Sequence, residues 1–236
     1  MAKFDSDWVP NTAMTIFAHP DDAEFSCSAT VAKWAKAGCE ITYVLITSGN
    51  IGTHDTTYTP ETLREVRERE QRNACNVLGV KHVEFLRHDD GRLVADLNLR
   101  RELVRLIRKY RPEVVFCGDP TQVFWLNNRI NHPDHRAAAL AAIDAVFPAC
   151  EMELLWPEAG PAWKVHGVYV RTEEGLNTWI DASDTIETKI KALREHHSQL
   201  DDNTGLEEMI HQRMADAGKT HGLAYAEAFR VIKLKE

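Results

Sequence analysis

The sequence predicts a three-layer α/β/α sandwich with a mostly parallel, Rossmann-like central sheet. From residue 14 onward, short apolar segments alternate with longer segments whose apolar residues recur at helical spacing. The apolar segments are shorter than a typical helix and rich in β-branched and aromatic residues, which favours strands. Because each of the first four predicted strands is followed by a helix, the sheet should be mostly parallel and covered on both faces.

The predicted elements follow one another in a regular order. The expected strands cover residues 14–18, 41–46, 82–86, 114–117, 165–170 and 178–181. The expected helices cover residues 23–37, 61–78, 99–110, 134–146, 186–198 and 206–217. Gly38 and Gly79 end the first two helices, and the third helix ends before Pro112, since proline cannot continue a helix.

A single domain is expected over residues 13–236, preceded by an N-terminal arm at residues 1–12. The chain shows no internal repeat, low-complexity tract or Gly/Ser-rich linker. No Gly-x-Gly-x-x-Gly sequence follows the first strand, and no complete phosphate-binding loop ending in Gly-Lys-Ser/Thr is present. The Rossmann-like sheet therefore lacks a nucleotide fingerprint.

Composition and charge exclude several classes of protein. The 236 residues carry 28 basic and 36 acidic side chains, a formal net charge of −8. Nucleic-acid binders normally show the opposite balance. No apolar run reaches the ~20 residues that span a bilayer, and the N-terminus lacks an apolar signal core. Five cysteines without a Cys-x-x-Cys spacing suit a reducing compartment. We expect a cytoplasmic protein with neither nucleic-acid nor membrane partners.

Two clusters of histidine and aspartate follow predicted strands. A His-Pro-Asp-Asp sequence at 19–22 comes directly after the first strand, and a His-Pro-Asp-His sequence at 132–135 opens the fourth helix. Reactive groups in open α/β sheets lie outside the carboxyl ends of the strands, so both clusters are expected at one edge. Adjacent buried carboxylates imply a nearby cation. The alternative is simple N-capping, with Asp21 or Asp22 capping the first helix.

Together the two clusters supply nitrogen and oxygen ligands and leave further groups for acid–base chemistry. Two histidines and an aspartate suit Zn²⁺ with coordination positions open to water and substrate. The remaining aspartate and histidine side chains can move protons. This combination of residues is typical of a metal-dependent hydrolase. Two unrelated N-caps would not explain why both clusters contain histidine, proline and aspartate.

The two clusters resemble the signature motifs of the LmbE-like, or PIG-L, family of zinc-dependent N-acetylglucosaminide de-N-acetylases. The similarity extends from about residue 13 to about residue 200. Supporting matches are Thr-x-Gly-x-x-Gly at 47–52, Arg-x-x-Glu at 67–70, Asp-Gly at 90–91 and His-x-Ser-Gln at 196–199. One departure is Asn50, where the family often has an acidic residue.

The resemblance implies roles for individual residues. The implied metal ligands, for Zn²⁺ or another divalent ion such as Fe²⁺, are His19, Asp22 and His135. The implied catalytic residues are the general base Asp21, the electrophilic or acid group His132, and its orienting partner Asp134. The implied substrate contacts are Arg67, Asn50 and Asp90.

The implied reaction removes an acetyl group from an N-acetylated amino sugar or its conjugate through a metal-activated water. The same residues would also serve a metal-dependent hydrolase that acts on a non-sugar amide or an ester. A non-catalytic sugar- or metal-binding module has no use for the acid–base groups and ranks below both. A homo-oligomer is consistent with this family.

Two further segments leave alternatives open. His196, late in the helix expected at 186–198, is predicted to serve helix packing or capping more than catalysis. Phe124, Trp125 and Leu126 precede the second cluster. They either wall the site and stack on a sugar ring, or belong to the core.

Overall fold

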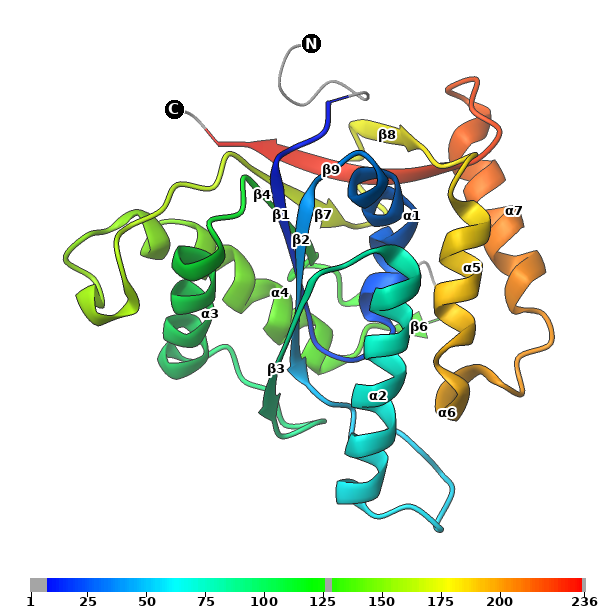
Figure 1. Cartoon of the computed structure of the whole chain (residues 1–236), viewed down its shortest axis with the longest axis horizontal. Coiled ribbons are helices and arrows are strands. Elements are labelled where there is room, and N and C mark those ends of the chain that lie inside the picture. Colours follow the sequence, from blue (N-terminus) through cyan, green and yellow to red (C-terminus); the bar gives the residue numbers. More distant parts are fainter. Residues whose placement is uncertain (1–7, 126–128, 235–236) are drawn as a thin grey trace.

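A seven-stranded sheet lies at the centre of the molecule, and helices cover both of its faces (Figure 1). The computed structural model describes residues 8–125 and 129–234. The strands of the sheet are β1 (Thr12–Phe17), β2 (Glu40–Thr47), β3 (His82–His88), β4 (Val114–Gly118), β7 (Gly167–Arg171), β8 (Thr178–Asp181) and β9 (Ala226–Lys233). A separate hairpin pairs β5 (Phe124–Trp125) with β6 (Arg129–Ile130).

The helices alternate with these strands along most of the chain. The longer helices are α1 (Asp22–Lys36), α2 (Pro60–Leu78), α3 (Leu97–Tyr110), α4 (Pro133–Val146), α5 (Ile186–Arg194) and α7 (Leu206–Lys219). The short helical segments are α6 (His197–Leu200) and the 3₁₀ turns η1 (Ala149–Glu151) and η2 (Pro157–Ala159). Among these helices, none combines the length and the apolar character that crossing a bilayer requires.

The strand order in the sheet is β3-β2-β1-β4-β7-β9-β8. The strands from β3 to β7 in this order all run parallel, and β9 runs antiparallel to both of its neighbours. The structure therefore confirms the predicted mostly parallel sheet within three layers.

Successive side chains of the central strands enter two different cores. In β1, Met14 and Ile16 pack with residues of α3 and α4, whereas Ala13 and Phe17 pack with residues of α1 and α2. Side chains alternate between the two faces of a strand, so a strand covered on both faces must be apolar at nearly every position. This requirement explains the continuous apolar segments in the sequence.

Among the strands of the central sheet and the longer helices, two elements differ from the sequence prediction. The helix expected at 186–198 is interrupted, because His196 is non-helical with φ −88° and ψ 60° between α5 and α6. The last strand, β9, was not predicted. Its buried Phe229 and Val231 alternate with more exposed residues, the period of a strand, but its place between β7 and β8 depends on distant pairing.

The described part of the predicted N-terminal arm lies against the sheet. Trp8 and Val9 pack on the core between the sheet and α1, and the Asn11 side chain donates to Glu113 at 3.0 Å. Residues 1–7 lie outside the described part of the chain. The division into an arm at 1–12 and one domain at 13–236 stays a prediction.

Candidate active site

Both clusters of histidine and aspartate lie near the carboxyl ends of adjacent parallel strands. Residues 19–22 connect β1 to α1, and residues 132–135 follow the hairpin after β4 and begin α4. Because β1 and β4 are neighbours in the sheet, the clusters meet although 116 positions separate His19 from His135. This is the edge at which open α/β sheets bind their ligands.

Two imidazoles and one carboxylate converge at this edge. Nε2 of His135 lies 3.2 Å from Nδ1 of His19 and 3.1 Å from Oδ1 of Asp22. The other oxygen of Asp22, Oδ2, lies 3.5 Å from Nδ1 of His19. Ligands bound tetrahedrally to Zn²⁺ are about 3.3 Å apart, as follows from metal–ligand distances near 2.0–2.1 Å. The three side chains therefore have the mutual spacing of metal ligands.

The other ring nitrogen of each histidine faces an oxygen atom. Nδ1 of His135 lies 3.1 Å from Oδ1 of Asn131. Nε2 of His19 lies 3.0 Å from Oδ1 of Asp90 and 3.4 Å from Oδ2 of Asp134. We call the ring nitrogen that faces the other ligands the inner nitrogen, and the remaining ring nitrogen the outer nitrogen. A histidine that carries its proton on the outer nitrogen presents the lone pair of the inner nitrogen to a metal. These oxygen atoms favour that tautomer in both rings.

In these tautomers, two nitrogen lone pairs and a carboxylate face one another, an arrangement that calls for a cation. Burial disfavours charge on His19, yet the carboxylates of Asp134, Asp22 and Asp90 outweigh it and raise the pKa of His19 to about 11. Asp22 likewise raises the pKa of His135. The surroundings thus favour positive charge at this point, and the donor set fits a divalent metal ion.

The Asp134 carboxylate lies 3.4 Å from Nε2 of His19, whereas the family resemblance implied that it orients His132. Its oxygens also accept hydrogen bonds from the backbone N–H groups of Gly91 at 2.7 Å and Leu93 at 3.2 Å. His132 is oriented by the backbone of Asp134 instead, whose N–H donates to Nδ1 at 3.2 Å. Burial and the nearby His19 lower the pKa of His132. Its neutral ring therefore carries the proton on Nε2.

The His132 ring offers an alternative third ligand. Its centroid lies 5.0 Å from that of His19 and 5.3 Å from that of His135, and one nitrogen of each ring lies within 4.8 Å of the others. Asp22 contacts the inner nitrogens of both other histidines, whereas Nδ1 of His132 is occupied by a backbone N–H. Asp22 is thus the better third ligand. A second possible ligand group consists of His19, Asp90 and Asp134.

Capping does not account for the first cluster. Asp21 occupies the N-cap position of α1, but its side chain makes no hydrogen bond to the described backbone of that helix. The Asp22 carboxylate accepts from the backbone N–H of His19 at 2.9 Å. In the second cluster, the residue that caps α4 is His132. The carboxylates of Asp21 and Asp22 therefore do not serve as N-caps, the role that was the alternative to metal binding and catalysis.

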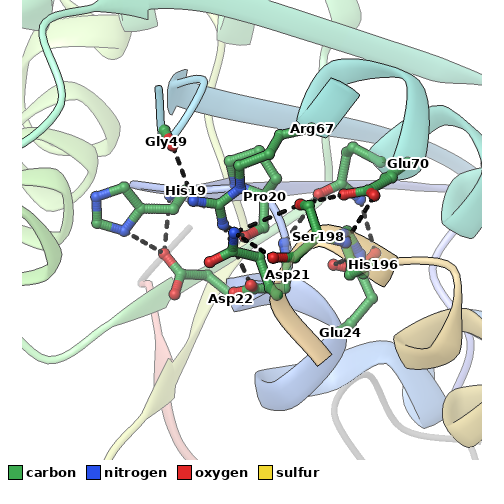
Figure 2. A network of polar contacts seen from close by, with 12 residues as sticks. His19, Pro20, Asp21, Asp22, Glu24, Gly49, Arg67, Glu70, His196 and Ser198 are labelled. Atoms are coloured by element: carbon green, nitrogen blue, oxygen red, sulfur yellow. Dashed lines mark hydrogen bonds and ion pairs between the residues drawn. The ribbon is translucent and has the colours of Figure 1, made fainter. Parts of the chain in front are cut away.

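Asp21 and Asp22 are adjacent in sequence but occupy opposite environments. Asp21 has a left-handed backbone, with φ 82° and ψ −23°, and its Oδ2 pairs with Nη2 of Arg67 at 3.2 Å (Figure 2). Burial raises the pKa of Asp21 despite Arg67. Burial also acts on Asp22, but His135 and His19 outweigh it and hold the pKa of Asp22 well below its usual range. One carboxylate suits ligation and the other suits proton transfer.

A cavity of about 720 Å³ lies beside these groups, within the size range of small-molecule sites. Trp125 lines it, and the guanidinium of Arg171 lies 5.4 Å from the centroid of the Trp125 ring. Trp125 thus belongs to the site wall, whereas Leu126 lies outside the described residues. The proposed metal and catalytic residues that line the cavity are Asp22, His132 and His135.

The three predicted substrate contacts are Arg67, Asn50 and Asp90, and each has a different environment. Arg67 is only 4% exposed, and its guanidinium donates to the carbonyl oxygens of Pro20 at 2.8 Å and Gly49 at 3.0 Å. Asp90 is buried against His19, and Asn50 is partly exposed in the loop after β2. Within the described part of the chain, the cavity lining includes none of the three. Their contact with substrate stays a prediction.

A family model described as GlcNAc-PI de-N-acetylase (PIG-L) matches residues 14–146, a segment that contains both clusters. The chain belongs to the PIG-L family. A PIG-L relative, the diacetylchitobiose deacetylase of Thermococcus kodakarensis, is 31% identical over 225 residues, which cover 93% of this chain and 82% of that protein. The sequence resemblance is therefore confirmed.

Two more proteins resemble this PIG-L chain over most of its length. The 1D-myo-inositol 2-acetamido-2-deoxy-alpha-D-glucopyranoside deacetylase 2 of Saccharopolyspora erythraea is 29% identical, covering 79% of this chain and 83% of that protein. The solved structure of N,N'-diacetylchitobiose deacetylase from Pyrococcus horikoshii matches with a TM-score of 0.87 at 28% identity. That match covers 98% of this chain and 88% of the other. Each of these relatives is named as a deacetylase of an N-acetylated amino sugar.

Some polar residues that build the site were not predicted. Asn131 holds the outer nitrogen of His135, and Gln71 accepts from the backbone N–H of Asp21 at 3.1 Å. Asn131 directly precedes the second cluster, and Gln71 follows Arg67 by one helical turn, so both have a sequence signal. Neither position in the sequence indicates which atom the side chain hydrogen-bonds to.

Proposed function

We propose that this PIG-L family protein is a zinc-dependent deacetylase that hydrolyses the acetamide of an N-acetylated amino sugar or its conjugate. The observation that carries the proposal is the convergence of His19, Asp22 and His135, with the carboxylate of Asp21 left over beside them. The names of the relatives support the same reaction class. The acid–base groups also argue against a module that only binds sugar or metal.

The proposed ligands are His19, Asp22 and His135, and their donor atoms suit Zn²⁺ while also accommodating an ion such as Fe²⁺. When bound, the metal supplies positive charge that makes water acidic enough to lose a proton near neutral pH and polarises the acetyl carbonyl. Asn131, Asp90 and Asp134 hold the two imidazoles in the orientation that ligation requires.

Asp21 is the proposed general base. It takes the proton of the attacking water as the oxygen bonds to the acetyl carbon, and it returns that proton to the nitrogen as the C–N bond breaks. His132 is the proposed electrophilic group, because its neutral ring has a proton on Nε2 to donate to the developing oxyanion. The second proton of the water, carried by the new carboxyl group, passes to the amine, so the products are acetate and an ammonium group, and atoms and charges balance.

The experiment that tests the function measures amine release from N,N'-diacetylchitobiose and other N-acetylglucosamine conjugates. The panel includes simple N-acetylated amines and aryl acetates, which represent the non-sugar amide and ester alternatives. We expect turnover of the sugar amides, loss of activity after chelation, and recovery with Zn²⁺. Preferential cleavage of the non-sugar substrates would assign the same groups to a different hydrolase. Tight binding without any turnover would support the module instead.

The remaining predictions concern the whole chain. We propose that residues 13–236 act as one deacetylase domain in the cytoplasm, and the five free, buried cysteines are compatible with that compartment. The proposed partner is a small N-acetyl sugar conjugate and neither nucleic acid nor a membrane. A homo-oligomer stays a prediction.

A further inference from the structure

The left-handed backbone of Asp21 requires support from its surroundings. A residue with a side chain rarely adopts φ 82°, and such a conformation persists only where neighbouring groups over-determine it. Side-chain capping does not supply the support, because the Asp21 side chain makes no hydrogen bond to the described N–H groups of α1. The backbone carbonyl of Asp21 accepts from the N–H of Phe25 at 3.0 Å, whereas the groups that hold its side chain and its N–H come from elsewhere in the fold.

Helix α2 holds both the side chain and the backbone of Asp21. Nη2 of Arg67 donates to the Asp21 carboxylate at 3.2 Å and to the carbonyl oxygen of Pro20 at 2.8 Å. One turn later on the same helix face, Oε1 of Gln71 accepts from the backbone N–H of Asp21 at 3.1 Å. Gln71 is fully buried. Its amide thus fixes the peptide unit that precedes the proposed general base.

Glu24 decides which way the Gln71 amide faces. Nε2 of Gln71 donates to Oε1 of Glu24 at 2.8 Å, so the amide oxygen is left to face Asp21, whose N–H can only donate. The other oxygen of Glu24 lies 3.6 Å from Nε2 of His196, and both side chains are fully buried. A buried carboxylate requires such a partner. Figure 2 shows this pair and His19 on opposite sides of Asp21.

We propose that Gln71, oriented by the buried Glu24–His196 pair, is a positioning residue that holds Asp21 in the conformation needed for proton transfer. The inference rests on the proposed function, in which Asp21 is the general base. The described lining of the cavity includes none of Gln71, Glu24 and His196. Because Gln71 bonds to the N–H of Asp21, we expect their effect on turnover to pass through Asp21. This assigns His196 a role beyond the helix packing predicted from the sequence.

The first test combines Gln71→Met with Asp21→Asn. Gln71→Met keeps the length of the side chain and removes the hydrogen bonds to Asp21 and Glu24. We expect kcat to fall by roughly ten- to a hundredfold, with KM within about twofold, because small displacements of a catalytic group cost this much. Metal content should stay at the wild-type level. In the Asp21→Asn chain, the same substitution should change the residual kcat by less than about twofold, because no carboxylate remains to be positioned.

The second test exchanges the two hydrogen-bonding groups. Gln71→Glu alone places two carboxylates against each other and should lower kcat strongly. In the double variant Gln71→Glu/Glu24→Gln, the carboxylate at position 71 can accept from both the Asp21 N–H and the amide at position 24. The bond from the Asp21 N–H is then kept in its original direction, the bond between positions 71 and 24 is restored in the reverse direction, and most of the lost kcat should return.

Asn177→Ala is the matched control, because the Asn177 amide also bonds to backbone, accepting from the N–H and donating to the C=O of Val231. It should lower the unfolding temperature and leave kcat unchanged. Equal losses of kcat from Gln71→Met in both backgrounds, or an unchanged kcat in that variant, would overturn the inference alone. A wild-type rate in Asp21→Asn would overturn the general-base assignment and the inference together.

Discussion

At the scale of single residues, Asp21 and Asp22 show how neighbours in sequence acquire different chemistry. Asp22 faces two imidazoles, whereas Asp21 has a left-handed backbone and its carboxylate pairs with Arg67. The first environment stabilises a permanent anion, and the second leaves a carboxylate whose pKa burial raises. The two proposed roles, ligand and base, follow from this divergence.

Asp21→Asn separates these roles. The amide retains the size of the side chain but cannot accept a proton, so we expect kcat to fall by about 10²–10⁴-fold, the usual contribution of a general base. Metal content should match that of the wild-type protein, since Asp21 is not a proposed ligand. Elemental analysis and amine release measure the two quantities. An unchanged rate would contradict the assignment.

His19→Ala should remove metal and activity together. The substitution deletes a proposed ligand and leaves Asp22 and His135 to hold the ion alone, so bound metal should drop well below one per chain. Elemental analysis after gel filtration provides the readout. His54→Ala is the control, because His54 lies in the loop before α2 and outside the described site. Full metal occupancy in His19→Ala would rule out this ligand set.

At the scale of elements, a buried ion pair between β9 and α5 bonds to the backbone of α1. Glu227 of β9 accepts from the backbone N–H groups of Ala29 at 3.1 Å and Thr30 at 2.7 Å. Lys189 of α5 donates to Glu227 at 2.7 Å and to the carbonyl oxygen of Phe25 at 3.0 Å. The unpredicted strand β9 thus anchors the helix that begins with Asp22.

Lys189→Met should weaken this anchor. Removing one partner of a buried ion pair leaves the other charge uncompensated, which typically costs about 3–5 kcal/mol. We expect the free energy of unfolding, measured by urea denaturation, to decrease by that order. Lys191→Met, an exposed position on the same helix, should change it little. Equal effects of the two substitutions would show that the pair carries no special stability.

At the scale of the whole molecule, the proposed metal and the protons of the site compete for one place. The pKa of His19 rises from 6.5 to about 11 in the folded chain. Without metal, the stability gained from this shift is therefore fully present below pH 6.5 and is lost as the pH rises towards 11. A bound metal would replace the proton and become tighter as the pH rises.

The unfolding temperature should therefore depend on pH in opposite ways in the chelated protein and in the metal-loaded protein. Between pH 7 and pH 9, the unfolding temperature of the chelated protein should fall, while that of the Zn²⁺-loaded protein should hold or rise. Differential scanning calorimetry on both forms gives the comparison. In His19→Ala, the decline of the chelated form should be smaller. Parallel curves for the chelated and loaded protein would argue against a shared site.

The sequence by itself determined the alternation of strands and helices and the two clusters at strand ends, because both are local patterns. The apolar β1 and the His-Pro-Asp-Asp sequence after it needed no distant contact to be recognised. Parallel strands also predict that both clusters lie at one edge, whereas the choice of His19, Asp22 and His135 as proposed ligands came from the resemblance to the PIG-L family.

Only the tertiary structure decided which atoms meet. The Asp134 carboxylate faces His19 instead of His132, Gln71 holds the backbone of Asp21, and β9 lies between β7 and β8. These arrangements join residues far apart in the chain, and each depends on side-chain direction and on which hydrogen-bonding groups become buried together. A one-dimensional pattern records the residue types but not their partners, so the roles of these residues emerge only when the chain is packed.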